Sequence, residues 1–157
     1  MKPTTSLLRR ATASGTFASL ASTLALIYGG VRDCRSALAP VNAVSHWIWK
    51  DKAISQQRPS MRYSAAGYLI HHAASIFWAL AYETALIARA PKPVRTEIAA
   101  SAAAVAALAC VVDLRCTPER LTPGFERRLE KTSLATVYTA FAIGLALHSL
   151  LSARDRD

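Results

Sequence analysis

Residues 68–83 place polar side chains at helical spacing inside an otherwise apolar segment. If this segment is a helix, one face carries a polar stripe made of Tyr68, His71, His72, Ser75, Tyr82 and Glu83. Imidazole groups can relay protons or bind a metal, and a carboxylate inside a membrane can couple to a proton or a cation. Because such groups are costly in hydrocarbon, we expect the polar stripe to face protein or water rather than lipid.

Two polar residues near the C-terminus match the polar stripe in expected depth. A helix rises about 1.5 Å per residue, which places Tyr138 level with His71 and His72 near one membrane surface. The same rise places His148 level with Glu83 near the opposite surface. An imidazole–phenol hydrogen bond is therefore geometrically possible at the first level, and at the second level Glu83 is expected to pair with His148 or with Arg89.

Other polar residues in apolar segments are expected to hold helices together. Asp113 ends the third apolar segment, where Arg62, Arg115 or a histidine is its expected partner. Ser19, Ser22 and Thr23 in the first segment are expected to bond either to a neighbouring helix or to the backbone four residues earlier.

A metal or haem site would have to use His46, His71 and His72. His148 lies about 14 Å of helical rise from His71, which is too far for both to bind one iron. Membrane hydroxylases and desaturases require several spaced histidine clusters, whereas this chain has a single His-His pair. The residues therefore predict no metal and no cofactor, and these three histidines are the candidates if a site exists.

The three cysteines are too few for a disulfide scaffold. Cys34 and Cys116 both follow an apolar segment onto the same side of the membrane, so an oxidising compartment would allow a disulfide between them. Cys110 lies within the third segment and is expected to be inert. The chain has no Walker loop, nucleophile elbow, dinucleotide fingerprint or pair of catalytic carboxylates, which favours a protein that is not an enzyme.

Four apolar segments must position these residues, at about 15–30, 63–87, 96–112 and 132–152. Charged residues are nearly absent from the segments and crowded between them, as in proteins that cross a bilayer several times. Arg32, Asp33 and Arg35 follow the first segment directly, which favours an uncleaved membrane anchor over a signal peptide. The expected fold is all-α, a polytopic transmembrane bundle of four helices in which residues 1–157 form a single transmembrane domain.

Two short interfacial helices are expected between the segments. Residues 40–50 are apolar but too short to span a bilayer, and Trp47 and Trp49 favour the head-group layer. This helix is either a surface anchor or a lid over the mouth of the bundle. Residues 122–130 begin with Thr122 as a helix cap and form the second expected interfacial helix.

The net charge of the chain is +9, from 19 basic and 10 acidic residues. Basic residues flank the apolar segments, which indicates lipid head groups as their partners and argues against nucleic acid. Lys2, Arg9 and Arg10 precede the first segment, and the first helix usually sets the orientation. Both termini are therefore expected on the cytoplasmic side.

Three stretches taken together resemble a known group of proteins: residues 39–49, the polar stripe with Trp78, and residues 120–126. They are similar to small bacterial inner-membrane proteins with four spans, a family with no known activity. The resemblance implies a multi-pass protein of the bacterial inner (cytoplasmic) membrane. It implies no cofactor, substrate or site residue.

Three functions remain open from the sequence. The first is an accessory or structural membrane protein whose polar interior holds its helices together. The second is a small proton-coupled transporter or permease, with His71, His72 and Glu83 along its path. The third is a haem-binding or metal-binding redox protein that uses His46 with His71 or His72. Expected partners are the lipid bilayer, another membrane protein, or a second copy packed through the alanines of the third segment.

Overall fold

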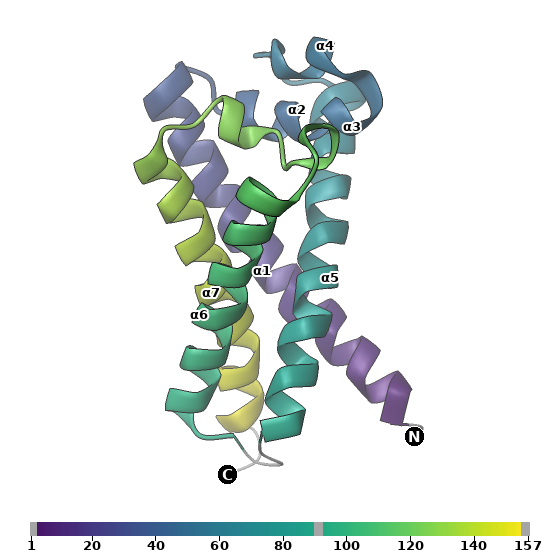
Figure 1. The fold of residues 1–157 in the computed structure, drawn as a ribbon, viewed down its shortest axis with the longest axis vertical. Helices are drawn as coiled ribbons and strands as arrows, with labels where there is room; N and C mark the ends of the chain where they lie inside the picture. Colours follow the sequence, from purple (N-terminus) through teal and green to yellow (C-terminus); the bar gives the residue numbers. More distant parts are fainter. Residues whose placement is uncertain (1–2, 90–92, 155–157) are drawn as a thin grey trace.

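Four long helices dominate the chain in the computed structural model, which describes residues 3–89 and 93–154 and has no strand among them. The four are α1 (Pro3–Cys34), α5 (Ala66–Arg89), α6 (Arg95–Val111) and α7 (Lys131–Arg154). α1 begins and α7 ends at the same end of the bundle, called the lower end from here on (Figure 1). The opposite, upper end carries the short helices. The predicted all-α fold is confirmed for these residues.

Three helices within the described ranges are long and apolar enough to cross a membrane: Ser6–Cys34, Arg95–Cys116 and Lys131–Ser152. They correspond to the first, third and fourth segments predicted from the sequence. The second predicted segment forms α5, which does not meet the same criterion. His71, His72 and Glu83 account for this difference, because each lowers the mean hydropathy of α5. The described helices thus provide three clear spans, where the sequence predicted four.

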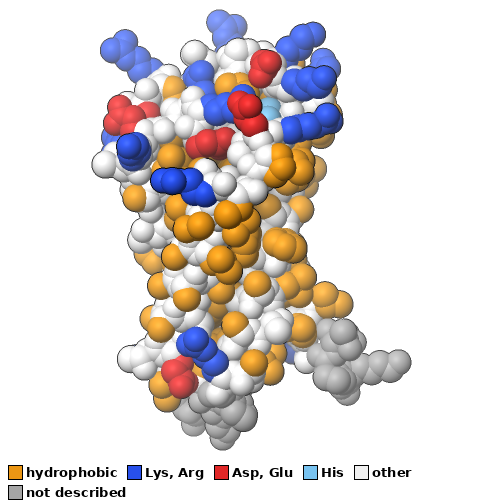
Figure 2. Space-filling view, viewed as in Figure 1, with side chains coloured by type: hydrophobic (Ala, Val, Ile, Leu, Met, Phe, Trp, Pro, Cys, Tyr) orange, Lys and Arg blue, Asp and Glu red, His pale blue; other side chains and the backbone are white. Residues whose placement is uncertain are grey.

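Apolar side chains form a belt between two charged ends. Figure 2 shows charged side chains concentrated at the upper end, a few at the lower end, and a largely apolar surface between them. All four long helices contribute exposed large hydrophobic residues, among them Leu20, Leu24, Leu69, Phe77, Leu108, Ile143 and Leu147. Soluble monomers rarely expose a continuous apolar surface of this extent. The distribution matches that of a protein embedded in a membrane.

α1 lies between α5 and α7 and packs along both of them. Two glycines allow the close approach. A Cβ atom on Gly144 of α7 would overlap the backbone of Ala18 in α1, and one on Gly15 of α1 would lie 2.7 Å from the Cα atom of Ile76 in α5. Small residues let membrane helices approach to backbone contact, and here they fix α5 and α7 on either side of α1.

α6 packs through one face of its alanine-rich sequence. Ile98 and Ala102 are buried against the bundle, whereas Ala99, Ala103 and Ala107 are exposed. The exposed alanines are those expected to pack against a second copy. That association stays a prediction.

Two groups of short elements close the upper end. The first group comprises α2 (Ala39–Val44), α3 (His46–Trp49), α4 (Asp51–Ile54) and a π-helical turn, η1 (Met61–Ala65). The second group comprises a π-helical turn, η2 (Val112–Cys116), and two 3-10 turns, η3 (Glu119–Leu121) and η4 (Phe125–Arg127).

These elements correct both predicted interfacial helices. The helix expected at 40–50 is divided into α2 and α3, and all six residues of α2 are buried, with α5 and α1 among its neighbours. α3 alone of this pair exposes large side chains, Trp47 and Ile48. The helix expected at 122–130 is reduced to the single turn η4, because Gly124 adopts a left-handed conformation with φ of 86° that is incompatible with a continuous helix.

Asn42 joins α2 to the segment that leads into α5. Its side chain is fully buried and donates hydrogen bonds to the carbonyl oxygens of Gln56, at 3.3 Å, and Arg58, at 3.1 Å. Its side-chain oxygen accepts a bond of 2.7 Å from the hydroxyl of Ser64. A buried amide with all of these bonds fixes the path of the chain above the bundle.

Candidate functional site

The polar stripe of α5 turns toward α1 and α7. Its fully buried members are Ser75, Tyr82 and Glu83, and its partly buried members are Tyr68, His71 and His72. On the opposite face of α5, Leu69 and Phe77 are each 64% exposed. The helix therefore shields its polar atoms within the bundle and presents apolar side chains outward.

Glu83 lies at the centre of a lower cluster contributed by three helices. Its Oε2 atom accepts a hydrogen bond of 2.8 Å from Nε of Arg10 in α1, and its side chain has no exposed surface. The Nδ1 atom of His148 in α7 lies 3.9 Å from Oε1 of Glu83. The ion pair with Arg10 compensates the buried carboxylate, which would otherwise be very costly in this environment.

Arg10 is the partner that the sequence analysis missed. The sequence predicts a first apolar segment that begins near residue 15, with Arg10 outside it among the lipid head groups. α1 actually begins at Pro3, so Arg10 lies within the helix, at the level of Glu83. Its side chain is 31% exposed, which leaves the guanidinium open toward the lower end.

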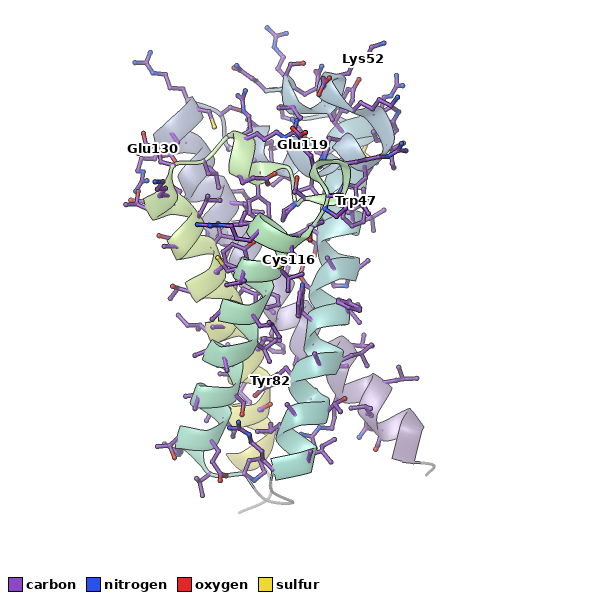
Figure 3. The ribbon with its side chains drawn as sticks, in the orientation of Figure 1. Trp47, Lys52, Tyr82, Cys116, Glu119 and Glu130 are labelled. Atoms are coloured by element: carbon purple, nitrogen blue, oxygen red, sulfur yellow. The ribbon has the colours of Figure 1, made fainter. Side chains whose placement is uncertain are left out.

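A second interhelical bond lies beside Glu83. The hydroxyl of Tyr82 donates to Oγ of Ser149 in α7, at 3.0 Å. Figure 3 shows Tyr82 in the lower half of the bundle. Below this bond a pocket of about 600 Å³ opens, and its lining includes Arg10, His148 and Ser149.

His71 belongs to an upper group and bonds to α1. Its Nε2 atom lies 2.8 Å from Oγ of Ser22. The hydroxyl of Ser22 also donates to the carbonyl oxygen of Ala18, at 2.8 Å. Because a hydroxyl has one proton, we assign Nε2 of a neutral His71 ring as the donor to Ser22, and this leaves Nδ1 as an acceptor.

Tyr138 does not form the predicted hydrogen bond with a histidine of the polar stripe. The hydroxyl of Tyr138 instead donates to Oδ2 of Asp113 in η2, at 3.0 Å. His72 stacks on Tyr68 with ring centroids 5.7 Å apart, and its Nδ1 atom is buried without a hydrogen bond to any described residue. Asp113 therefore pairs with a phenol, not with the arginines expected from the sequence.

A cavity of about 500 Å³ lies between α5 and α6, with α7 behind it. Its walls are largely apolar, and three of its polar residues come from three different elements: His71 of α5, Asp113 of η2 and Tyr138 of α7. Phe125 closes its upper part, with its ring 6.4 Å from His71 and 6.3 Å from Tyr138 between centroids. Trp47 also lines the cavity, and Figure 3 shows it near the upper end of the bundle.

The histidines named as metal candidates are held apart in separate contacts. His46 is buried, and its Nδ1 atom donates to the carbonyl oxygen of Ala43 at 3.0 Å. His71 is bonded to Ser22 and His72 is stacked on Tyr68. Across residues 3–89 and 93–154, no three histidine, cysteine, aspartate or glutamate side chains gather closely enough to hold a metal ion.

The disulfide considered between Cys34 and Cys116 is not formed. Both cysteines are free, and Sγ of Cys34 donates to the carbonyl oxygen of Arg128 at 3.5 Å. Cys116 is exposed at the end of η2, above α6 (Figure 3). Cys110 is also a free thiol, partly buried on α6.

Comparison with known proteins adds no relative: no protein-family model, no curated protein and no solved structure matches the chain. The resemblance to small bacterial four-span proteins therefore stays a prediction. Functional conclusions depend on the geometry of the lower cluster and of the cavity between α5 and α6.

Proposed function

We propose that this chain is a four-span protein of the bacterial inner membrane that serves an accessory or structural role. In this proposal α5 is the fourth span. Its 24 residues correspond to a length of about 36 Å, enough for a hydrocarbon core of about 30 Å. Its outward face is apolar, and its polar face is bonded to α1 and α7. A helix of this kind is stable in a bilayer only as part of a bundle.

The observation that carries the proposed role is the contact of Glu83 with Arg10 and its approach to His148. These three residues belong to α5, α1 and α7 and lie where the three helices meet. The charges compensate each other inside the bundle, and the Tyr82–Ser149 bond adds a further link between α5 and α7. Polar groups used in this way contribute cohesion between helices.

Glu83→Gln tests the cohesive role by thermal unfolding in mild detergent. The change leaves Arg10 without its anionic partner, and we expect a loss of about 1–3 kcal/mol of stability, reduced in part because Arg10 is partly exposed. Arg10→Gln should cost a similar amount. The double variant should cost less than the sum of the two single changes, because neither charge is then left alone.

The exposed position Phe77 provides the matched control on the same helix, and Phe77→Leu should leave the unfolding midpoint nearly unchanged. Additive effects of Glu83→Gln and Arg10→Gln would show that the two side chains are not coupled. That result would contradict the cohesive role of the lower cluster.

Proton-coupled transport is the second candidate, and one observation favours it. The lower pocket reaches Arg10 and His148 beside Glu83, and the Oε1 atom of Glu83 has no hydrogen-bond partner among the described residues. An intramembrane carboxylate with a free oxygen next to an open pocket is able to exchange a proton. Proton entry into proteoliposomes, followed with an internal pH dye, separates the two roles. Transport requires flux that Glu83→Gln abolishes and Tyr82→Phe retains, whereas an accessory protein gives no flux in any of these forms.

A further inference from the structure

The cavity between α5 and α6 has the dimensions and lining of a site for one small lipophilic molecule. Its volume of about 500 Å³ lies within the range of about 300–1,000 Å³ typical of small-molecule sites. Apolar and aromatic side chains form most of its wall, including Ile70, Trp78, Val137 and Phe141. Three of its polar residues, His71, Asp113 and Tyr138, come from three different elements.

The cavity borders the outward apolar belt of the bundle. Phe77 lines it and is also 64% exposed on the outward face of α5. Ala109 of α6 and Val112 of η2 line it, and the neighbouring Leu108 and Val111 of α6 are more than half exposed. The short elements of the upper end cover it from above through Trp47 and Phe125. A ligand would therefore enter sideways from the apolar belt.

His71 and Asp113 each present an acceptor atom for which the described residues offer no donor. Nδ1 of His71 is left as an acceptor by the bond from Nε2 to Ser22, and the described residues offer it no donor. One carboxyl oxygen of Asp113 accepts the bond from Tyr138, and no bond to the other oxygen is present in the described part of the chain. Ser75 supplies no donor either, because its hydroxyl is bonded to the carbonyl oxygen of His71.

We propose that this cavity binds a lipophilic molecule with a hydroxyl-bearing aromatic ring, of the hydroquinone type, carrying an apolar tail. The ring hydroxyls donate to His71 and to Asp113. The ring lies among Phe125, Trp78 and Phe141, and the tail extends past Phe77 into the bilayer. A lipid acyl chain would fill the apolar part but would leave the acceptors of His71 and Asp113 unbonded, which is unfavourable in a dry site.

A pair of matched ligands tests the site without any variant. The probe is a hydroquinone with a ten-carbon tail, and the control is its dimethyl ether, which keeps the ring and tail but has no hydroxyl donors. We expect the hydroquinone to raise the unfolding midpoint of the detergent-solubilised protein in a saturable way. The ether should bind at least about tenfold more weakly, because it cannot donate to either acceptor. Equal affinity for both ligands, or binding of neither, would overturn the assignment.

Variants then locate the site. Asp113→Asn keeps an acceptor for Tyr138 but removes the carboxylate, and His71→Leu removes the ring acceptor. Each should weaken hydroquinone binding by about tenfold, compared with its own ligand-free protein. Glu83→Gln lies in the lower cluster, outside this cavity, and should leave the affinity unchanged. If Asp113→Asn and His71→Leu bind as tightly as the unaltered protein, the ligand lies elsewhere and the assignment fails.

Discussion

Buried polar side chains divide α5 into two parts with different roles. In the lower part, Glu83 and Tyr82 are bonded to Arg10 and Ser149 on the neighbouring helices. In the upper part, Nε2 of His71 is bonded to Ser22. The other ring nitrogen, Nδ1, has no donor among the described residues. The same polar stripe thus bonds to α1 and α7 at one end and lines a cavity at the other.

Asn42 provides a residue-scale test of how the upper end is held. Asn42→Ala removes the bonds to the carbonyl oxygens of Gln56 and Arg58 and to the hydroxyl of Ser64. We expect a loss of about 1–3 kcal/mol in stability, measured by thermal unfolding in detergent, because buried groups are left unbonded. Thr136→Ala is the control, since that exposed hydroxyl bonds only to its own helix. Equal unfolding midpoints for the two variants would show that Asn42 does not fix this segment.

Only some of the contacts in the candidate site could be predicted from the residue pattern of the sequence. The spacing of the polar stripe predicted which face of α5 would be polar, because helical periodicity depends on local geometry alone. The same reasoning brought His148 and Glu83 to one level, and their side chains lie 3.9 Å apart at the closest atoms. It did not find Arg10, whose position depended on where α1 begins. It also missed the Tyr138–Asp113 bond, because the π-helical turn η2 alters the register at the end of α6.

At the scale of elements, the close contact between α1 and α7 depends on Gly144. Gly144→Leu would force a side chain into the backbone of Ala18 and the carbonyl oxygen of Phe17, and we expect a loss of about 1–3 kcal/mol or a rearranged bundle. Thermal unfolding and the helical circular-dichroism signal would report it. Ala135→Leu on the exposed face of α7 is the control. Equal midpoints for Gly144→Leu and Ala135→Leu would mean that the two helices can separate freely at this point.

The short elements were the least predictable from sequence. Residues 40–50 have the composition of a surface helix, yet α2 is buried because α5 offers Gly67, which has no side chain, directly opposite the backbone of Val41. Residues 122–130 begin with Thr122, a residue type that often caps helices. Gly124, however, adopts a left-handed conformation beside Ala43 and His46, and this interrupts the helix. Both outcomes depend on contacts between segments far apart in the chain, which a local pattern does not contain.

At the scale of the whole molecule, the orientation in the membrane is testable with the native cysteines. Cys116 is exposed at the upper end, whereas Cys34 is partly buried and bonded to Arg128. If both termini are cytoplasmic, a membrane-impermeant maleimide should label Cys116 from the periplasm in spheroplasts. Cys116→Ser removes the signal and serves as the control. Labelling of Cys116 only after the membrane is opened would reverse the orientation.

The position of α1 has a consequence for biogenesis. Of the four long helices α1 leaves the ribosome first, but the acidic partner of its Arg10 is 73 residues further along the chain. α7, which packs on the other side of α1, is translated last of the four long helices. In the proposed four-span protein, the insertion machinery has to accommodate an arginine without a counter-ion until those later helices reach the bilayer. Nascent chains halted before α5 should therefore remain close to the translocon, and release into lipid should follow once the carboxylate arrives.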